Sequence, residues 1–239
     1  MRSKPPADGL RLSVIVPVLD EAGMVTALGR LQPLRLRGHE VIVVDGGSRD
    51  GSPEAAQAVA DHVIQSPRGR ALQMNAGART AKGDVLLFLH ADTILPADAD
   101  RLIIEGLDGS GRAWGRFDVR LSGEATALRV VAFFMNQRSR LTGIATGDQA
   151  IFVRRATFER IGGFPALALM EDIALTRRLR RVSRPLCLRE QVVASSRKWE
   201  REGVVRTVLL MWRLRLAFFL GADPAELARR YYPSREQEP

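Results

Sequence analysis

The sequence predicts an α/β fold in which helices cover both faces of a central sheet. Short apolar, β-branched runs alternate with helical patterns through the first half of the chain. The runs Val14-Ile15-Val16 and Val41-Ile42-Val43-Val44 are continuously hydrophobic, which indicates strands that are buried on both faces. A hydrophobic content of 46% over 239 residues is enough for a sizeable core. These observations favour a doubly wound sheet and exclude a disordered or fibrous chain.

The first half of this fold is predicted as strands with helices between them. The strands are expected at 12–19, 41–44, 63–64 and 85–89, and the helices at 22–36, 53–60, 70–81 and 97–107. In such folds ligands bind beyond the carboxyl ends of the strands, where the strand order reverses. Polar residues that directly follow strands are therefore the first candidates for a site.

The second half of the chain is less regular. Strands are expected at 115–121 and 149–153, with a helix at 124–140 between them. A further helix is expected from Glu171, because Leu175, Leu179 and Val182 are spaced to bury one face. No linker, internal repeat or low-complexity tract separates the two halves, so a single domain over 1–239 is predicted.

Asp45 follows the second predicted strand and stands beside two glycines that permit a tight turn. A carboxylate at the buried end of an apolar strand needs a partner, such as the N–H of a base or a ribose hydroxyl. Ser52 in the same segment is explained by capping of the next helix. We therefore expect Asp45 to serve ligand binding more than turn formation.

The fourth predicted strand ends in His90-Ala91-Asp92, whose first and third side chains point to the same side of an extended chain. Mg²⁺ and Mn²⁺ prefer carboxylate and phosphate oxygens. Asp92 is thus a candidate metal ligand, although Thr93 and Pro96 also suit the start of a helix. The pair Glu171-Asp172 opens another helix, where the macrodipole stabilises acids by roughly 0.3–1 kcal/mol each.

Together these segments resemble the family 2 glycosyltransferases. That family has a Rossmann-like nucleotide-diphospho-sugar transferase (GT-A) fold, with a mixed central sheet and helices on both faces. Its motifs are Pro-x-x-(Asn/Asp)-Glu, then Asp-Asp/Gly-Gly-Ser-x-Asp-Gly, then an Asp-x-Asp metal motif. The matching segments here are 17–21, with one extra residue before the acidic pair, 45–51 and 90–92. The resemblance extends through 70–84, 147–149 and 171–172, and covers roughly residues 12–199.

The resemblance implies a nucleotide diphosphate sugar as donor, with a UDP-sugar expected, bound in a donor half at about 10–112. Asp45 would accept a hydrogen bond from the base, and Asp20 and Glu21 would line the base and ribose pocket. Arg70 would reach the diphosphate. The other donor-binding residues expected are Pro17, Ser48, Asn75, Ala91, Asp92, Gly147, Asp148 and Gln149.

The resemblance also implies a reaction. Asp172, next to Glu171, would be the base that deprotonates an acceptor hydroxyl in an inverting transfer, within an acceptor half at about 113–200. Asp92 would bind Mn²⁺ or Mg²⁺. His90 departs from the family, which usually has Asp at that position, so it would ligate the metal, hydrogen-bond the sugar or simply pack.

Arg197-Lys198-Trp199 is similar to the Arg-Trp ending of the Gln-x-x-Arg-Trp element of processive relatives. Lys198 separates the pair and Ala194 takes the Gln position, which argues against processive synthesis. Arg197 could contact the diphosphate and Trp199 could stack on sugar. A snorkelling Arg beside a core Trp explains the pair equally well.

The net charge of +9 is concentrated in the C-terminal third, where it would attract the phosphates of a nucleotide, a nucleic acid or an anionic membrane. The apolar segment 204–220 is interrupted by Arg206, Arg213 and Arg215 and is too charged to span a bilayer. We expect C-terminal helices over 201–239, with peripheral membrane contact as one alternative. A lone Cys187 and a polar N-terminus suit the cytoplasm, and a lipid-linked acceptor would place the chain at the inner face of the membrane.

Other classes of protein fit less well. No Gly-x-Gly-x-x-Gly or Walker-type loop follows the first predicted strand, which argues against a dinucleotide oxidoreductase or a P-loop enzyme. An aromatic content of 6% and the lack of a DNA- or RNA-binding signature give no reason to expect a nucleic-acid partner. Transfer to a polyprenyl phosphate and non-catalytic nucleotide-sugar binding remain alternatives. The identity of the acceptor is open.

Overall fold

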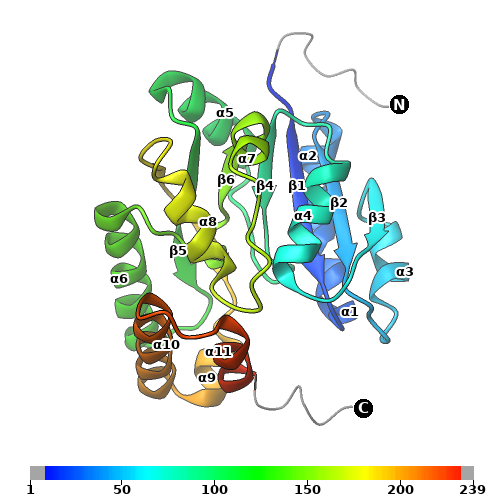
Figure 1. Ribbon diagram of the computed structural model, residues 1–239. Helices are drawn as coiled ribbons and strands as arrows, with labels where there is room; N and C mark the ends of the chain where they lie inside the picture. Colours follow the sequence, from blue (N-terminus) through cyan, green and yellow to red (C-terminus); the bar gives the residue numbers. More distant parts are fainter. Residues whose placement is uncertain (1–8, 233–239) are drawn as a thin grey trace.

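The computed structural model describes residues 9–232, without the side chains of Met24, Thr26 and Lys198. The described chain forms a seven-stranded sheet in the order β3-β2-β1-β4-β6-β5-β7 (Figure 1). The strands are β1 Leu12–Val18, β2 Glu40–Asp45, β3 His62–Gln65, β4 Val85–Phe88, β5 Trp114–Leu121, β6 Phe152–Arg154 and β7 Leu186–Ala194. Neighbours among β1–β4 pair in parallel, β6 is antiparallel to β4 and β5, and β7 is parallel to β5. The predicted mixed α/β fold is confirmed.

Helices cover both faces of this sheet (Figure 1). They are α1 Ala22–Val25, η1 Thr26–Leu31, α2 Gln32–Leu36, α3 Ser52–Gln57, α4 Arg70–Thr80, α5 Ala99–Ser110, α6 Thr126–Thr142, η2 Gly147–Gln149, α7 Arg155–Arg160, α8 Glu171–Leu179, α9 Arg197–Glu202, α10 Val204–Phe219 and α11 Pro224–Tyr231, with η for 3-10 helices. Val14 and Val16 of β1 enter a core with α1, α2, α3, α5 and α6. Ile15 between them enters a second core with α4, α7 and α8. This double burial explains the continuous hydrophobicity of β1.

The structure corrects the sequence predictions at three elements. The helix predicted at 22–36 is divided into α1, η1 and α2, and Pro33 at the start of α2 lacks the N–H that a continuing helix needs. The strand predicted at 149–153 begins only at Phe152, because Ala150 takes the left-handed conformation with φ 47°. The sequence does not predict β7, because exposed residues at 189–191 interrupt its apolar pattern where its register with β5 shifts.

The direction of β6 decides which segments meet at one edge of the sheet. The parallel strands β1, β2 and β4 end at the same edge, where Val18 pairs with Asp45. β6 runs the opposite way and places its first residue, Phe152, opposite Leu87 of β4. The residues before β6, which include η2, therefore lie at the carboxyl ends of β1 and β4.

The C-terminal helices pack against the start of α8. Met170 and Ile173 there form a third apolar cluster with Leu214 of α10 and Leu227 of α11. Figure 1 shows α10 and α11 at the carboxyl-end edge of the sheet, beside α6 and α9. These helices therefore wall the space beyond the strand ends.

Gly77 tests the packing of α4 on the sheet, because a Cβ there would lie 2.4 Å from Ile15 Cγ2 and 3.0 Å from Val44 Cγ2. We expect Gly77→Ala to lower the free energy of unfolding by about 1–3 kcal/mol, since an overpacked core must shift its side chains or backbone. Gly109 in α5 has no neighbour within 4 Å of such a Cβ. Gly109→Ala, the control, should be neutral or stabilising by up to about 1 kcal/mol. Urea unfolding measures both, and wild-type stability of Gly77→Ala would contradict the close approach.

Candidate functional site

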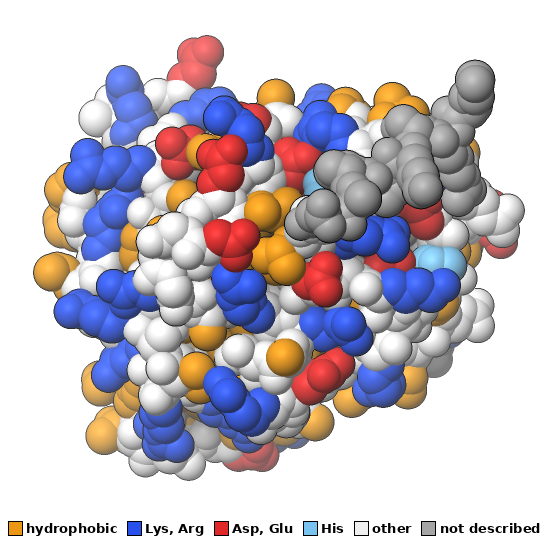
Figure 2. Space-filling model, turned by 90° about the horizontal axis from the view of Figure 1, so that it is seen from above, with side chains coloured by type: hydrophobic (Ala, Val, Ile, Leu, Met, Phe, Trp, Pro, Cys, Tyr) orange, Lys and Arg blue, Asp and Glu red, His pale blue; other side chains and the backbone are white. Residues whose placement is uncertain are grey.

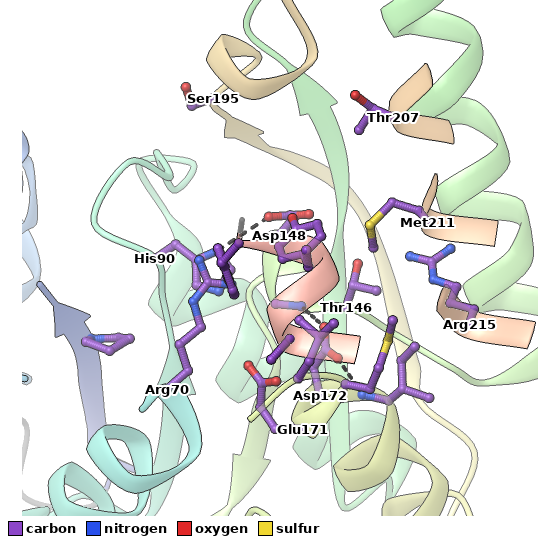
Figure 3. A pocket seen from close by; sticks show the side chains of 18 of the residues that line it. Arg70, His90, Thr146, Asp148, Glu171, Asp172, Ser195, Thr207, Met211 and Arg215 are labelled. Atoms are coloured by element: carbon purple, nitrogen blue, oxygen red, sulfur yellow. Dashed lines mark hydrogen bonds and ion pairs between the residues drawn. The ribbon is translucent and has the colours of Figure 1, made fainter. Parts of the chain in front are cut away.

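A cavity of about 1040 Å³ opens at the carboxyl edge of the sheet (Figure 3). Its walls come from the ends of β1 and β4, the first residues of α4 and α8, η2, and side chains of α6, α10 and α11. The predicted site residues that line it are Pro17, Glu21, Arg70, His90, Ala91, Asp92, Gly147, Asp148, Glu171, Asp172 and Trp199. Residues far apart in the sequence thus share one cavity.

The other predicted residues lie outside the cavity lining. They are Asp20, Asp45, Ser48, Asn75, Gln149 and Arg197. Asp45 is fully buried, and its carboxylate accepts the N–H groups of Gly47 at 2.9 Å and Ser48 at 3.1 Å. The turn itself therefore supplies the partner that we expected from a base or ribose. Contact between Asp45 and a base stays a prediction.

Asp20 and Ser48 join the loops that follow β1 and β2. The Asp20 N–H donates to Ser48 Oγ at 2.9 Å, and Asp20 Oδ1 accepts the Arg49 N–H at 2.8 Å. Asp20 has a φ of 54°, a left-handed conformation in which Asp is one of the better tolerated residues. This cross-link holds the loop after β1, where Glu21 lines the cavity together with Pro17 near the end of β1.

Asn75 and Gln149 hold the segments that lead into α8 and η2. The Asn75 side chain donates to Phe164 O and accepts the Phe164 N–H, both at 2.9 Å. Gln149 is fully buried, where its Oε1 accepts the Thr146 N–H at 3.3 Å and its Nε2 donates to Ser139 Oγ at 3.1 Å. Both side-chain amides therefore form hydrogen bonds within the protein and hold the segments that line the cavity.

The centre of the cavity is built on η2. Gly147 donates its N–H to Asp172 Oδ2 at 2.9 Å, and Asp148 Oδ1 lies 3.4 Å from His90 Nδ1. A Cβ on Gly147 would lie 2.4 Å from His90 Nε2, so only glycine permits this approach. η2 thus joins the segment after β4 to the first turn of α8.

The charges around Asp148 and Arg70 stabilise each other. Burial by itself would raise the pKa of Asp148, but the hydrogen bond with His90 and the positive charges of His90, Arg70 and Arg215 lower it. Burial would lower the pKa of Arg70, but the phenol and carboxyl groups around it, including Glu171, raise it. In Figure 3 the Arg70 side chain extends toward Asp148 and His90. Arg70 therefore offers a permanent cation beside the strand ends.

Glu171 is the least exposed acid of the cavity, at 7% of its surface. Burial first, and the neighbouring charge of Asp172 second, raise its pKa to about 7. Arg70 and His90 act in the opposite direction without cancelling this rise. Glu171 therefore exchanges its proton near neutral pH, which suits a group that passes protons in catalysis.

The cavity offers a divalent metal one carboxylate rather than a complete set of ligands. Within residues 9–232, no three His, Cys, Asp or Glu side chains come together as a complete metal site. Asp92 lines the cavity, and its carboxylate shows no hydrogen bond or ion pair with the described residues. Mg²⁺ commonly binds one or two carboxylates and takes further ligands from phosphates and water. Asp92 fits such an ion, whereas His90 Nδ1 is already directed to Asp148.

Two further groups of lining residues have no individual site role in the sequence prediction. One is apolar and comes from α6 and α10, with Val130, Phe134, Met211 and Trp212 among its members. The other is basic and consists of Arg138 and Arg215, together with Arg68 and Arg229. Arg215 lies on the helical face opposite Arg206 and Arg213. This spacing is the feature of the sequence that indicates that Arg215 points into the cavity.

Comparisons with known proteins identify the family of this chain. Residues 13–162, more than half of the chain, match the sequence profile of Glycosyl transferase family 2. The chain belongs to this family. The predicted family resemblance is thereby confirmed.

The curated relatives include undecaprenyl-phosphate 4-deoxy-4-formamido-L-arabinose transferases of Pseudomonas aeruginosa, with 30% identity over 60% of this chain. The chain spans about half the length of these relatives, since the match covers 46% of them. Among solved structures, a mannosyltransferase from Pyrobaculum calidifontis with GDP-Man and Mn²⁺ has a TM-score of 0.63 at 24% identity, over 90% of this chain and 63% of its own. Staphylococcus aureus TarS with UDP-GlcNAc has a TM-score of 0.62 at 20% identity, over 78% and 58%. These likenesses confirm the predicted GT-A fold.

The raised pKa of Glu171 predicts a pH-dependent stability. Between its usual value of 4.5 and about 7, the folded protein binds more protons at Glu171 than the unfolded chain does, so stability falls as the pH rises through this window. We expect Glu171→Gln to exceed wild type in unfolding free energy at pH 8, by up to about 3 kcal/mol. The difference should shrink toward pH 4.5. Chemical unfolding across this range measures it, and a difference independent of pH would refute the shift.

Proposed function

We propose that this protein transfers a sugar from a nucleotide diphosphate sugar, a UDP-sugar in the first instance, to an acceptor hydroxyl with inversion at the anomeric carbon. The observation that carries the proposal is the shared cavity, in which Arg70 and Asp92 lie with Asp172. Binding proteins need no carboxylate pair beside the sugar, which favours an enzyme over a non-catalytic relative. GDP-Man and UDP-GlcNAc are bound by two proteins of the same fold.

On the donor side, Arg70 would hold the diphosphate and Asp92 the metal. Bound there, Mn²⁺ or Mg²⁺ would neutralise charge that develops on the departing nucleoside diphosphate. Structures of this fold are known with Mn²⁺ or Mg²⁺ bound. The loop after β1, held by Asp20 and Ser48, would receive the base and ribose.

Asp172 would remove the proton from the acceptor hydroxyl as this attacks the anomeric carbon. Its two oxygens accept backbone N–H groups, Oδ2 from Gly147 at 2.9 Å and Oδ1 from Ile173 at 2.7 Å. These bonds fix the orientation of the carboxylate. Glu171 beside it would exchange a proton with Asp172 near neutral pH, because burial raises its pKa to about 7.

The apolar wall from α6 and α10 favours a lipid-linked acceptor. Curated relatives act on undecaprenyl phosphate, as their name states. Transfer to the phosphate of a polyprenyl carrier is therefore the second candidate function, and it would not require a base at Asp172.

The outer face of α10 supports contact with a membrane surface. Its exposed apolar residues recur every three or four positions and form one stripe, at Val205, Leu209, Trp212, Leu216 and Phe219. α6 adds the exposed Val130, Phe133 and Phe134, and Arg206 and Arg213 flank the stripe. No helix among the described residues is long and apolar enough to cross a membrane. Anionic headgroups and acyl chains match this basic, apolar surface.

The opposite face of the molecule has a different character. Figure 2 looks onto the edge where the amino ends of the parallel strands lie, and there basic, acidic and apolar side chains alternate. Such a mixed surface is ordinary for a protein in water. The proposed membrane contact is therefore assigned to the side of α6 and α10 and not to this face.

The division of roles predicts separable variants. Asp172→Asn should bind the donor with Mn²⁺ as wild type does but transfer sugar about 10²–10⁴-fold more slowly, because it loses the base. Asp92→Ala should instead lose the Mn²⁺ dependence of donor binding. Calorimetry with UDP-, GDP- and dTDP-sugars, with and without Mn²⁺, and product formation test both. Asp108→Asn is the matched control at an exposed site outside the cavity. Undiminished turnover in Asp172→Asn would remove it as the base.

The α10 stripe predicts binding to lipid vesicles. Trp212 and Leu216 are 65% and 61% exposed, so the double change Trp212→Ser and Leu216→Ser should leave the fold intact. Removing both should weaken binding to vesicles with anionic lipid at least about 10-fold, because apolar burial drives insertion. Leu36→Ser, at a residue 58% exposed on α2, is the control. Co-sedimentation measures the partition, and equal partition of all three proteins would disprove the contact.

A further inference from the structure

Arg138 of α6 and Arg215 of α10 line the cavity on the side away from Arg70. In Figure 3, Arg70 and Arg215 approach Asp148 and Asp172 from opposite sides. Nε and Nη2 of Arg138 and Nε of Arg215 are buried without a hydrogen-bond partner among the described residues. Buried guanidinium N–H groups are costly to leave unpaired. Among the described residues, the fold therefore leaves part of the hydrogen-bonding capacity of these two cations unused.

Other arginines in the same region have found partners within the protein. Asp118 pairs with both Arg116 and Arg140, the latter at 2.5 Å, although Nε of Arg116 is also buried without a hydrogen-bond partner among the described residues. Asp172 and Asp148 are the carboxylates whose charges favour the ionised forms of Arg138 and Arg215. Neither forms an ion pair with the two arginines within residues 9–232. If the two arginines served only to stabilise the fold, they would be expected to form ion pairs with these carboxylates.

The two arginines also disfavour each other. Burial first, and then the charge of Arg215, lower the pKa of Arg138 to about 10. Burial lowers the pKa of Arg215 as well. Arg138 is still charged at neutral pH, so the fold brings two partly desolvated cations to one cavity. An anion between them would relieve both the repulsion and the unpaired N–H groups.

We propose that Arg138 and Arg215 bind a phosphate group carried by the acceptor, so that the acceptor is an anionic amphiphile. This inference rests on the proposed function, since it specifies the acceptor of that reaction. Three unpaired guanidinium nitrogens on two side chains match the oxygens of a phosphate better than the two oxygens of a carboxylate. The apolar wall of Phe134, Met211 and Trp212 is continuous with the pair and would take the apolar part.

The position of the pair separates this phosphate from those of the donor. Arg70 lies at the start of α4, next to the strand ends where the nucleotide is expected. Arg215 comes from the opposite wall, with Asp148 and Asp172 between the two arginines (Figure 3). A phosphate at Arg138 and Arg215 thus lies on the far side of the proposed base, where an acceptor must enter.

The test uses octyl phosphate as the probe, with octanol and inorganic phosphate as partial probes. Octyl phosphate should bind the wild-type protein more tightly than either, and saturating UDP with Mn²⁺ should not displace it. Arg138→Met and Arg215→Met should each weaken octyl phosphate binding about 10- to 100-fold, the effect of a lost charge-assisted hydrogen bond. Arg129→Met on α6 removes the same charge at an exposed position and should bind as wild type.

Thermal unfolding separates a binding role from a structural one. Arg138→Met and Arg215→Met should unfold at or above the wild-type temperature without ligand, because an apolar chain replaces an unpaired buried cation. A lower Tm with unchanged octyl phosphate binding would assign the pair to the fold and overturn the proposal.

Further outcomes would also overturn it. Displacement of octyl phosphate by UDP would assign the pair to the donor, and equal affinity for inorganic phosphate would make the ligand free phosphate. Absence of octyl phosphate binding in the wild type would exclude the site without any variant. Failure of the protein to transfer sugar would refute the proposed function, yet leave the binding of octyl phosphate measurable and thus separately decided.

Discussion

The site depends on the antiparallel direction of one short strand, β6, within the otherwise parallel sheet. β6 runs antiparallel between β4 and β5, so the residues before it arrive at the edge where β1, β2 and β4 end. Gly147 there touches His90 and donates its N–H to Asp172. A parallel strand at this place would put η2 at the opposite edge of the sheet, away from the first turn of α8. The backbone of η2 thereby joins the two halves of the proposed reaction centre.

The cavity that results has an ordered arrangement of charge. A permanent cation, Arg70, stands beside the strand ends, the acids Asp148, Glu171 and Asp172 occupy the middle, and Arg138 and Arg215 close the far wall. Arg70 would bind the phosphates of the donor, and Arg138 and Arg215 would bind the phosphate of the acceptor on the other side of the base. The two substrates would thus meet at the base while their negative charges remain separated. The partly desolvated cations lower the stability of the folded protein. Such destabilising groups are common in binding sites.

The C-terminal helices link this site to the outer surface. α10 contributes Leu214 to the cluster against α8, Arg215 to the cavity, and Trp212 and Leu216 to the exposed stripe. One helix therefore packs on the start of α8, supplies a cation to the cavity and presents an apolar surface. If that surface lies on a membrane, an amphiphilic acceptor would pass along the same helix from the bilayer to Asp172.

The sequence by itself determined the α/β class, the parallel strands and the strand-end position of Asp45 and His90-Ala91-Asp92, because burial and turn chemistry are local properties of a chain. It also carried the family motifs. Only the tertiary structure showed that the Asp45 carboxylate accepts a backbone N–H of its own turn. It also showed that the side chains of Asn75 and Gln149 form hydrogen bonds within the protein, outside the cavity lining. Arg138, Arg215 and β7 escaped prediction for a related reason. Whether a cation has a partner, and which strand lies beside another, depends on segments that are distant in the sequence and meet only in the folded chain.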